Sequence, residues 1–138
     1  MLYGEFCSPK QSLELRNMGF DDPCFAFYRD SVNRLSVLLH KQPGAWQNSK
    51  TGSDYCAPLR QQVFKWFREN HNLDSEIYLN HESGSKFYHY LILSLDKNLI
   101  DWKSKNVIKF KTHEEAQSAC IDNLIQILKE IKWPKILK

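Results

Sequence analysis

No stretch of this sequence is apolar over a length that could cross a membrane. The longest apolar runs lie at 24–28 and 90–93, whereas a spanning helix needs about 20 apolar residues. The beginning of the chain, residues 1–9, carries neither the basic nor the apolar segment of a secretion signal. We therefore expect a cytoplasmic protein without a membrane partner.

Glycine, proline and excess charge are also scarce. Five glycines and five prolines in 138 residues exclude a low-complexity linker, and 42% hydrophobic residues are enough to form a core. A chain of this length usually forms one domain, so we expect a single domain over residues 1–138. The net charge of +3 is spread evenly over the two halves, so charge alone does not demand a polyanionic partner.

The complete residue sets that catalysis or metal binding requires are missing as well. The four cysteines form no C-x-x-C pair, and we interpret them as reduced thiols. No H-x-x-x-H, H-E-x-x-H or glycine-rich phosphate loop occurs. We therefore expect no catalytic residue, no metal site and no cofactor, and a protein that is not an enzyme.

Cys56 and a pair of histidines come nearest to a reactive site. Cys56 lies just before Pro58 and a predicted helix start, a setting that lowers a thiol pKa, but a packed thiol is the favoured interpretation. His81 and His89 would face the same way across a hairpin if its turn had three residues. No further ligand accompanies them, so ordinary hydrogen bonding in a sheet is favoured over metal binding.

Capping residues and apolar runs predict the elements of the first half of the chain. Ser8, followed by proline, starts a helix over 9–18. Apolar runs at 24–28 and 35–40, separated by turn-forming residues, predict a hairpin. The dense turn formers of 42–56 predict the longest loop.

The next predicted element is an amphipathic helix that opens at Pro58 and ends near His71. Its apolar residues recur at helical spacing and form one buried stripe. The residues of that stripe are Leu59, Val63, Trp66 and Phe67.

Three strands and a long helix are predicted for the second half. The strands cover 76–81, 87–95 and an irregular 99–110, and 87–95 is apolar on both faces and therefore central. The helix starts at the capping box of 112–115 and is expected to end near Trp133, before Pro134. The order α-β-β-α-β-β-β-α predicts an α+β fold with helices packed on a mainly antiparallel sheet.

Aromatic residues outside the predicted core stripes suggest a recognition surface, since tyrosine and tryptophan are enriched at interfaces. The middle strand and the lysine-rich turn that follows it would carry most of this surface. The candidate partner-binding residues are Tyr88, Tyr90, Trp102, Lys103, Lys105, Trp46 and Tyr55. The opposing interpretation is that the N-terminal segment covers Tyr88 and Tyr90 as ordinary packing.

A nucleic acid is the alternative partner. Residues 58–132 follow the order α-β-β-β-α, which is similar to that of double-stranded-RNA-binding domains. Those domains carry lysines at the start of their last helix, whereas this chain has Glu114 and Glu115 there, which would repel phosphate. A lysine-rich strand and turn would have to supply the contacts instead.

Three segments, spread over nearly the whole chain, resemble a group of small uncharacterised proteins encoded in prophages and mobile elements of gut bacteria. The resemblance implies a fold and no chemistry, because these motifs stop or start helices and carry no catalytic or binding residue. The segments are Gly19-Phe20-Asp21-Asp22-Pro23-Cys24-Phe25-Ala26, Ala57-Pro58-Leu59-Arg60-Gln61-Gln62-Val63 with Trp66-Phe67-Arg68-Glu69, and the helix start from Thr112 to Glu115-Ala116.

These observations favour a non-enzymatic accessory or interaction module that binds another macromolecule. A protein partner is favoured over a nucleic acid because charge does not demand a polyanionic partner and the middle predicted strand carries two tyrosines, Tyr88 and Tyr90.

Overall fold

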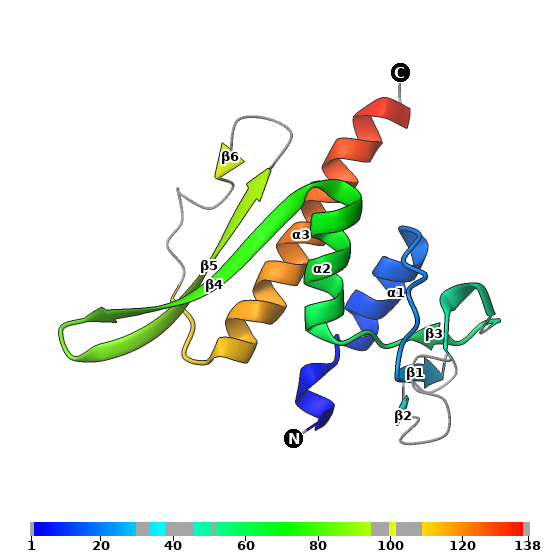
Figure 1. Ribbon diagram of the computed structural model, residues 1–138, viewed down its shortest axis with the longest axis horizontal. Helices are drawn as coiled ribbons and strands as arrows, with labels where there is room; N and C mark the ends of the chain where they lie inside the picture. Colours follow the sequence, from blue (N-terminus) through cyan, green and yellow to red (C-terminus); the bar gives the residue numbers. More distant parts are fainter. Residues whose placement is uncertain are drawn as a thin grey trace. The chain divides into compact units, whose positions relative to one another are not determined.

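The described residues of the computed structural model are 2–29, 34–37, 46–50, 52–94, 100–101 and 109–136. The chain divides into two compact units, Met1–Gln62 and Val63–Lys138, and the boundary falls within helix α2 (Arg60–His71). Helices and antiparallel strands occur in both units, so the predicted α+β class is confirmed (Figure 1). The described residues form two three-stranded sheets in place of the one sheet expected. That residues 1–138 behave as a single domain stays a prediction.

The first unit combines one α-helix with a small antiparallel sheet. In the sheet, strand β1 lies between β2 and β3. The elements are η1 (Leu2–Glu5), α1 (Pro9–Asn17), β1 (Ala26–Arg29), β2 (Arg34–Val37), η2 (Asn48–Lys50) and β3 (Tyr55–Cys56).

Helix α1 begins and ends where its capping residues predict. The Gln11 amide donates to Ser8 Oγ at 3.1 Å, and the Ser8 amide donates to Gln11 Oε1 at 3.1 Å, which completes a capping box. Gly19, just past the helix, has φ +98°, a backbone conformation that favours glycine. The predicted helix over 9–18 is therefore confirmed.

Strands β1 and β2 form the predicted hairpin, whose turn lies outside the described residues. The predicted loop at 42–56 is wrong in part, because Tyr55 and Cys56 pair with β1 as strand β3. A strand of two residues is too short to show an alternation of apolar and polar residues, and turn-forming residues surround it, so the sequence does not predict it. The sheet buries a small core of Phe6, Ala26, Tyr28, Tyr55 and Ala57.

The second unit contains most of α2, a longer antiparallel sheet and a long helix. Strand β5 is central in the sheet order β4-β5-β6, as predicted, and α3 packs against β5 and β4 (Figure 1). The elements after α2 are β4 (Leu73–Glu82), β5 (Ser85–Ser94), β6 (Ile100–Asp101) and α3 (His113–Ile136).

Helix α2 begins at Arg60, two residues after the predicted start, and ends at the predicted residue. Leu59 of the predicted stripe lies before the helix and is half-buried. Val63, Trp66 and Phe67 are buried. The ring of His71 meets the Trp66 ring edge-on at 4.6 Å, and Asn72, with φ +53°, ends the helix and leads into β4. Asparagine tolerates this left-handed conformation better than most residues.

A two-residue turn fixes the register of the β4–β5 hairpin. Ser83 and Gly84 have φ +51° and +80°, as in the primed turns that match the twist of two paired strands. Glu82 therefore pairs with Ser85, and Tyr78 pairs with His89. The three-residue turn that would bring His81 and His89 to one face is one residue too long, because Ser85 already belongs to β5.

Helix α3 begins as predicted and continues beyond the predicted end. The Glu115 amide donates to Thr112 Oγ1 at 3.1 Å, and Glu115 Oε2 accepts from the Lys111 amide at 3.3 Å. The helix runs to Ile136, past Pro134. A proline in the last turn removes one backbone donor, and the preceding turns hold the helix in place. None of the helices in the described part of the chain combines the length and the hydropathy needed to span a bilayer.

Replacing Trp66 by alanine tests the orientation of α2. Because Trp66 is 6% exposed and its ring contacts Phe67 and His71, Trp66→Ala should lower the free energy of unfolding by about 3–5 kcal/mol. Urea denaturation measures the change. The control Lys65→Ala, at an exposed position on the same helix, should change it by less than about 0.5 kcal/mol. Equal effects of the two substitutions would contradict this orientation.

Candidate functional site

Helix α3 covers the face of β5 that carries the candidate residues Tyr88 and Tyr90. Tyr90 is 8% exposed. Its hydroxyl accepts a hydrogen bond from the side-chain nitrogen Nδ2 of Asn123 in α3. Tyr88 is half-buried, and its ring meets that of His113 edge-on at 5.6 Å. The face that carries these tyrosines is therefore packed. The segment that packs on it is α3, whereas the opposing interpretation assigns this role to the N-terminal segment.

Two of the other candidate recognition residues, Trp46 and Tyr55, belong to the first unit. Tyr55 is 2% exposed and lies in the core of the first unit, where the half-buried Trp46 packs against Phe27 with ring centroids 4.2 Å apart. The remaining candidates, Trp102, Lys103 and Lys105, lie outside the described residues. Partner binding by any of them stays a prediction.

The two hairpin histidines lie on opposite faces of the sheet. Because the turn has two residues, His81 pairs with Lys86 while His89 pairs with Tyr78. His89 is buried and stacks on Tyr78, with ring centroids 5.3 Å apart. In the described ranges of the chain, no three His, Cys, Asp or Glu side chains gather in a way that could hold a metal ion.

All four cysteines are buried and none is in a disulfide, and two of them, Cys24 and Cys56, form a hydrogen-bonded pair in the first unit. The hydrogen bond to Cys56, followed by burial, raises the pKa of Cys24. The Cys24 Sγ also lies 3.3 Å from the Asp22 carbonyl oxygen, which competes with Cys56 for the single thiol proton. The hydrogen bond from Cys24 lowers the pKa of Cys56, against the effect of burial. Cys56 is fully buried, as the packed interpretation predicts.

Tyr28 makes a buried polar contact in the core of the first unit. Its hydroxyl donates to the Cys7 carbonyl within the buried cluster. Burial, followed by the proximity of Cys7 and Tyr55, raises the pKa of Tyr28 from 10.0 to about 12. The folded state therefore holds the Tyr28 proton more tightly than the unfolded state does.

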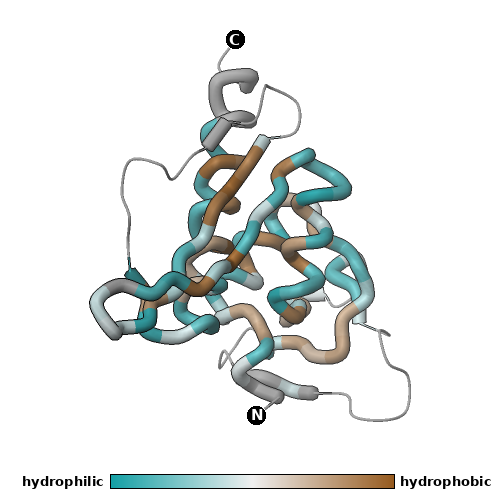
Figure 2. The backbone as a smooth tube through the Cα atoms, turned by 60° about the vertical axis from the view of Figure 1, so that its left-hand side comes forward, coloured by the Kyte–Doolittle hydropathy of each residue, from teal (hydrophilic) through white to brown (hydrophobic). Residues whose placement is uncertain are grey.

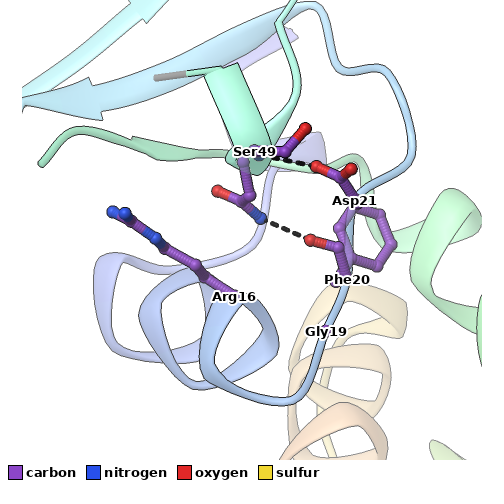
Figure 3. Close-up of a pocket in the computed structure, with 6 residues that line it drawn as sticks. Arg16, Gly19, Phe20, Asp21 and Ser49 are labelled. Carbon is purple, nitrogen blue, oxygen red and sulfur yellow. Dashed lines mark hydrogen bonds between the residues drawn. The ribbon is translucent and has the colours of Figure 1, made fainter. Parts of the chain in front are cut away.

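A hollow of about 330 Å³ opens on the first unit between α1 and η2 (Figure 3). Its polar side chains bind the backbone of the chain itself. Arg16 Nη1 donates to the Asp54 carbonyl at 2.8 Å, and Asp21 Oδ1 accepts from the Ser49 amide at 2.7 Å. These groups hold the segments 46–50 and 52–54 against α1 and its C-terminal turn.

Asn48 is the central residue of this loop attachment. Its amide nitrogen donates to the Phe20 carbonyl at 2.7 Å, and its amide oxygen accepts from the Cys56 amide at 2.9 Å. One buried side chain thus satisfies two backbone groups from segments 36 residues apart in sequence, 56 − 20 = 36. We interpret the hollow as a structural attachment of the loop.

Strand β4 lies at one edge of the sheet in the second unit. Among the described residues, β4 pairs with β5 alone. A two-residue turn directs the even-numbered amides of β4 toward β5 and the odd-numbered ones outward. The Tyr88 amide confirms this alternation, because it donates to Phe110 on the other side of β5, at 2.8 Å.

Two of the outward amides of β4 donate hydrogen bonds to side chains, and we call them filled. The two amides between them have no acceptor among the described residues, and we call them open. Asp74 Oδ1 accepts from the Ser75 amide at 2.9 Å, and Asn80 Oδ1 accepts from the His81 amide at 3.0 Å. No described residue accepts from the outward amides of Ile77 and Leu79. The open window is therefore the three residues from Ile77 to Leu79.

The same window carries exposed apolar side chains. Tyr78 and Leu79 are each 44% exposed and lie on opposite faces of the sheet, as neighbours in a strand do. The turn end of the hairpin extends away from α3 in Figure 1, and the hairpin becomes more hydrophilic toward its turn in Figure 2. We define the β4 edge as residues 74–81 and take it as the candidate functional site.

Sequence reasoning did not single out this edge. The sequence predicts a strand at 76–81, but its pattern does not say whether that strand lies at an edge. The roles of Asp74 and Asn80 depend on which amides face outward, and this follows only from the register.

No family model, no curated protein and no solved structure shows detectable similarity to this chain.

Removing the Asn48 side chain tests the loop attachment. Asn48→Ala leaves the Phe20 carbonyl and the Cys56 amide without their side-chain partner, so the free energy of unfolding should fall by about 2–3 kcal/mol. The matched change Ser49→Ala, at an exposed neighbour, should have an effect below about 0.5 kcal/mol. Chemical denaturation compares the two, and an equal effect would show that Asn48 does not hold the loop.

The Tyr28 hydroxyl makes stability depend on pH at the alkaline end. Tyr28→Phe should cost about 1–2 kcal/mol at neutral pH because the Cys7 carbonyl loses its donor. The folded-state pKa is raised, so this contribution is fully present below pH 10.0 and is lost as the pH rises to about 12.

The difference in unfolding free energy between the wild type and Tyr28→Phe should therefore shrink over that pH interval. Denaturation of both proteins at several pH values measures this difference. The contributions of the other titrating groups cancel because both proteins contain them. A difference that stays constant up to pH 12 would contradict the raised pKa.

Proposed function

We propose that this chain is a non-enzymatic interaction module that binds an extended segment of protein by strand addition at the β4 edge. The observation that carries the proposal is the pair of open outward amides at Ile77 and Leu79, flanked by amides that side chains fill. In strand addition, backbone hydrogen bonds supply affinity, and alternate side chains supply specificity.

The side chains of the window support this mode of binding. An added strand would place alternate residues beside Tyr78 on one face of the sheet and beside Leu79 on the other. Both side chains are already exposed, so binding covers apolar surface without opening the fold.

Protection of the flanking amides also supports the proposal. An unprotected edge strand invites uncontrolled pairing, and proteins usually block it with charge, proline or a bulge. Here Asp74 and Asn80 occupy the amides on either side of the window through hydrogen bonds within β4 itself. The edge is thus blocked at its ends and open at its centre, which favours a short, specific partner strand.

A differential peptide selection tests the proposal. The immobilised chain is exposed to a display library of random peptides, and the selected peptides are measured against two variants. Leu79→Pro removes the outward donor while sparing the hydrogen bonds to β5, because proline is tolerated at edge positions of this kind. Leu79→Val is the matched control, since it keeps both the amide and an apolar side chain.

Selected peptides should bind the Leu79→Val variant nearly as well as the wild type and bind Leu79→Pro about tenfold more weakly or worse. Equal binding to all three proteins would exclude the β4 edge as the site. Failure to select any peptide, together with salt-sensitive binding of RNA by the wild type, would overturn the proposal in favour of nucleic-acid binding.

A further inference from the structure

The pattern of filled and open amides on the β4 edge is symmetric about Tyr78. The open amides, of Ile77 and Leu79, stand one residue to either side of Tyr78. The filled amides, of Ser75 and His81, stand three residues to either side. An edge with this symmetry matches itself when a second copy is laid against it in the antiparallel direction.

An antiparallel pair of β4 strands with a two-fold axis at Tyr78 places each residue with an open amide opposite the other residue with an open amide. The amide and carbonyl of Ile77 would face those of Leu79 of the second copy, and the reverse pair would form on the other side of the axis. Ser75 would stand opposite His81 of the second copy, where neither amide needs a new partner. The two edges would therefore form four backbone hydrogen bonds.

The side chains of the window also complement one another in this arrangement. Tyr78 would meet Tyr78 of the second copy, and Leu79 would meet Ile77 of the second copy, which covers both exposed apolar residues. Glu76 would stand opposite Asn80 of the second copy, a carboxylate beside an amide donor instead of a second carboxylate. Asp74, toward the end of the edge, already has Arg68 beside it at 3.7 Å.

We propose that the partner strand at the β4 edge is β4 of a second copy of this chain, so that the protein forms a symmetric dimer with a continuous sheet across the two-fold axis. This inference rests on the proposed strand addition and names its occupant. Closed two-fold pairing uses the same patch on both copies, which is the commonest symmetry of protein oligomers. A contact of one strand edge is small, so we expect a reversible dimer that dissociates on dilution.

Sedimentation equilibrium of the full chain under reducing conditions tests the dimer. The average mass of the wild type should rise toward twice the monomer mass with increasing concentration. Tyr78→Lys places like charges opposite each other at the axis and should stay monomeric, as should Leu79→Pro. The control Leu13→Lys, which changes a 41% exposed apolar residue of α1, should dimerise like the wild type.

Cysteine crosslinking tests the register and does not depend on the stability of those variants. With the axis at Tyr78, the two side chains at this position face each other at the Cβ separation of about 4.5–5.5 Å expected for opposed residues. Tyr78→Cys should therefore form an intermolecular disulfide under mild oxidation. Asn80→Cys should not, because its counterpart lies four residues away along the paired strands. The native cysteines are buried. Crosslinking of the wild type under the same conditions measures the background that they contribute.

The outcomes separate this inference from the proposed function. A wild type that stays monomeric at all concentrations, with no crosslink at Tyr78→Cys, overturns the dimer; selected peptides that still discriminate against Leu79→Pro would then leave strand addition intact. Crosslinking of Asn80→Cys as efficiently as Tyr78→Cys overturns the register and with it the symmetric dimer. Dimerisation that Tyr78→Lys and Leu79→Pro leave unchanged overturns the β4 edge as the interface.

Discussion

The two-residue turn at Ser83 and Gly84 is the constraint on which the second unit depends. Both residues have positive φ, which closes β4 onto β5 with Glu82 opposite Ser85. A one-residue slip would exchange the two faces of β4 relative to β5 and also change which of its amides point outward. The packing of α3 and the open window of β4 are therefore two consequences of one turn.

Much of the fold could be predicted because its signals are local. The N-cap residues Ser8 and Thr112 identify the starts of two helices. The apolar stripe through Val63, Trp66 and Phe67 identifies the buried face of a third. The predicted secondary structure is wrong where it depends on pairing with a segment that is distant in the sequence. Tyr55 and Cys56 become a strand only because β1 lies beside them. A tertiary contact of this kind leaves no periodicity in the sequence.

The candidate site was less predictable than the fold. Alternation places Tyr88 and Tyr90 on one face of β5, but it does not tell which face a helix will cover. The hydrogen bond from Asn123 to Tyr90 belongs to the packed interface with α3. On β4, Asp74 and Asn80 look like ordinary polar residues of a strand until the register shows that they fill outward amides.

Backbone amide hydrogen exchange along β4, measured by NMR on a dilute sample, tests the account most directly. The register and the open window predict slow exchange for Tyr78 and Asn80, whose amides bond to β5, and fast exchange for Ile77 and Leu79, whose amides face outward. Slow exchange at Ile77 and Leu79 in the dilute sample, or fast exchange at Tyr78 and Asn80, would contradict it.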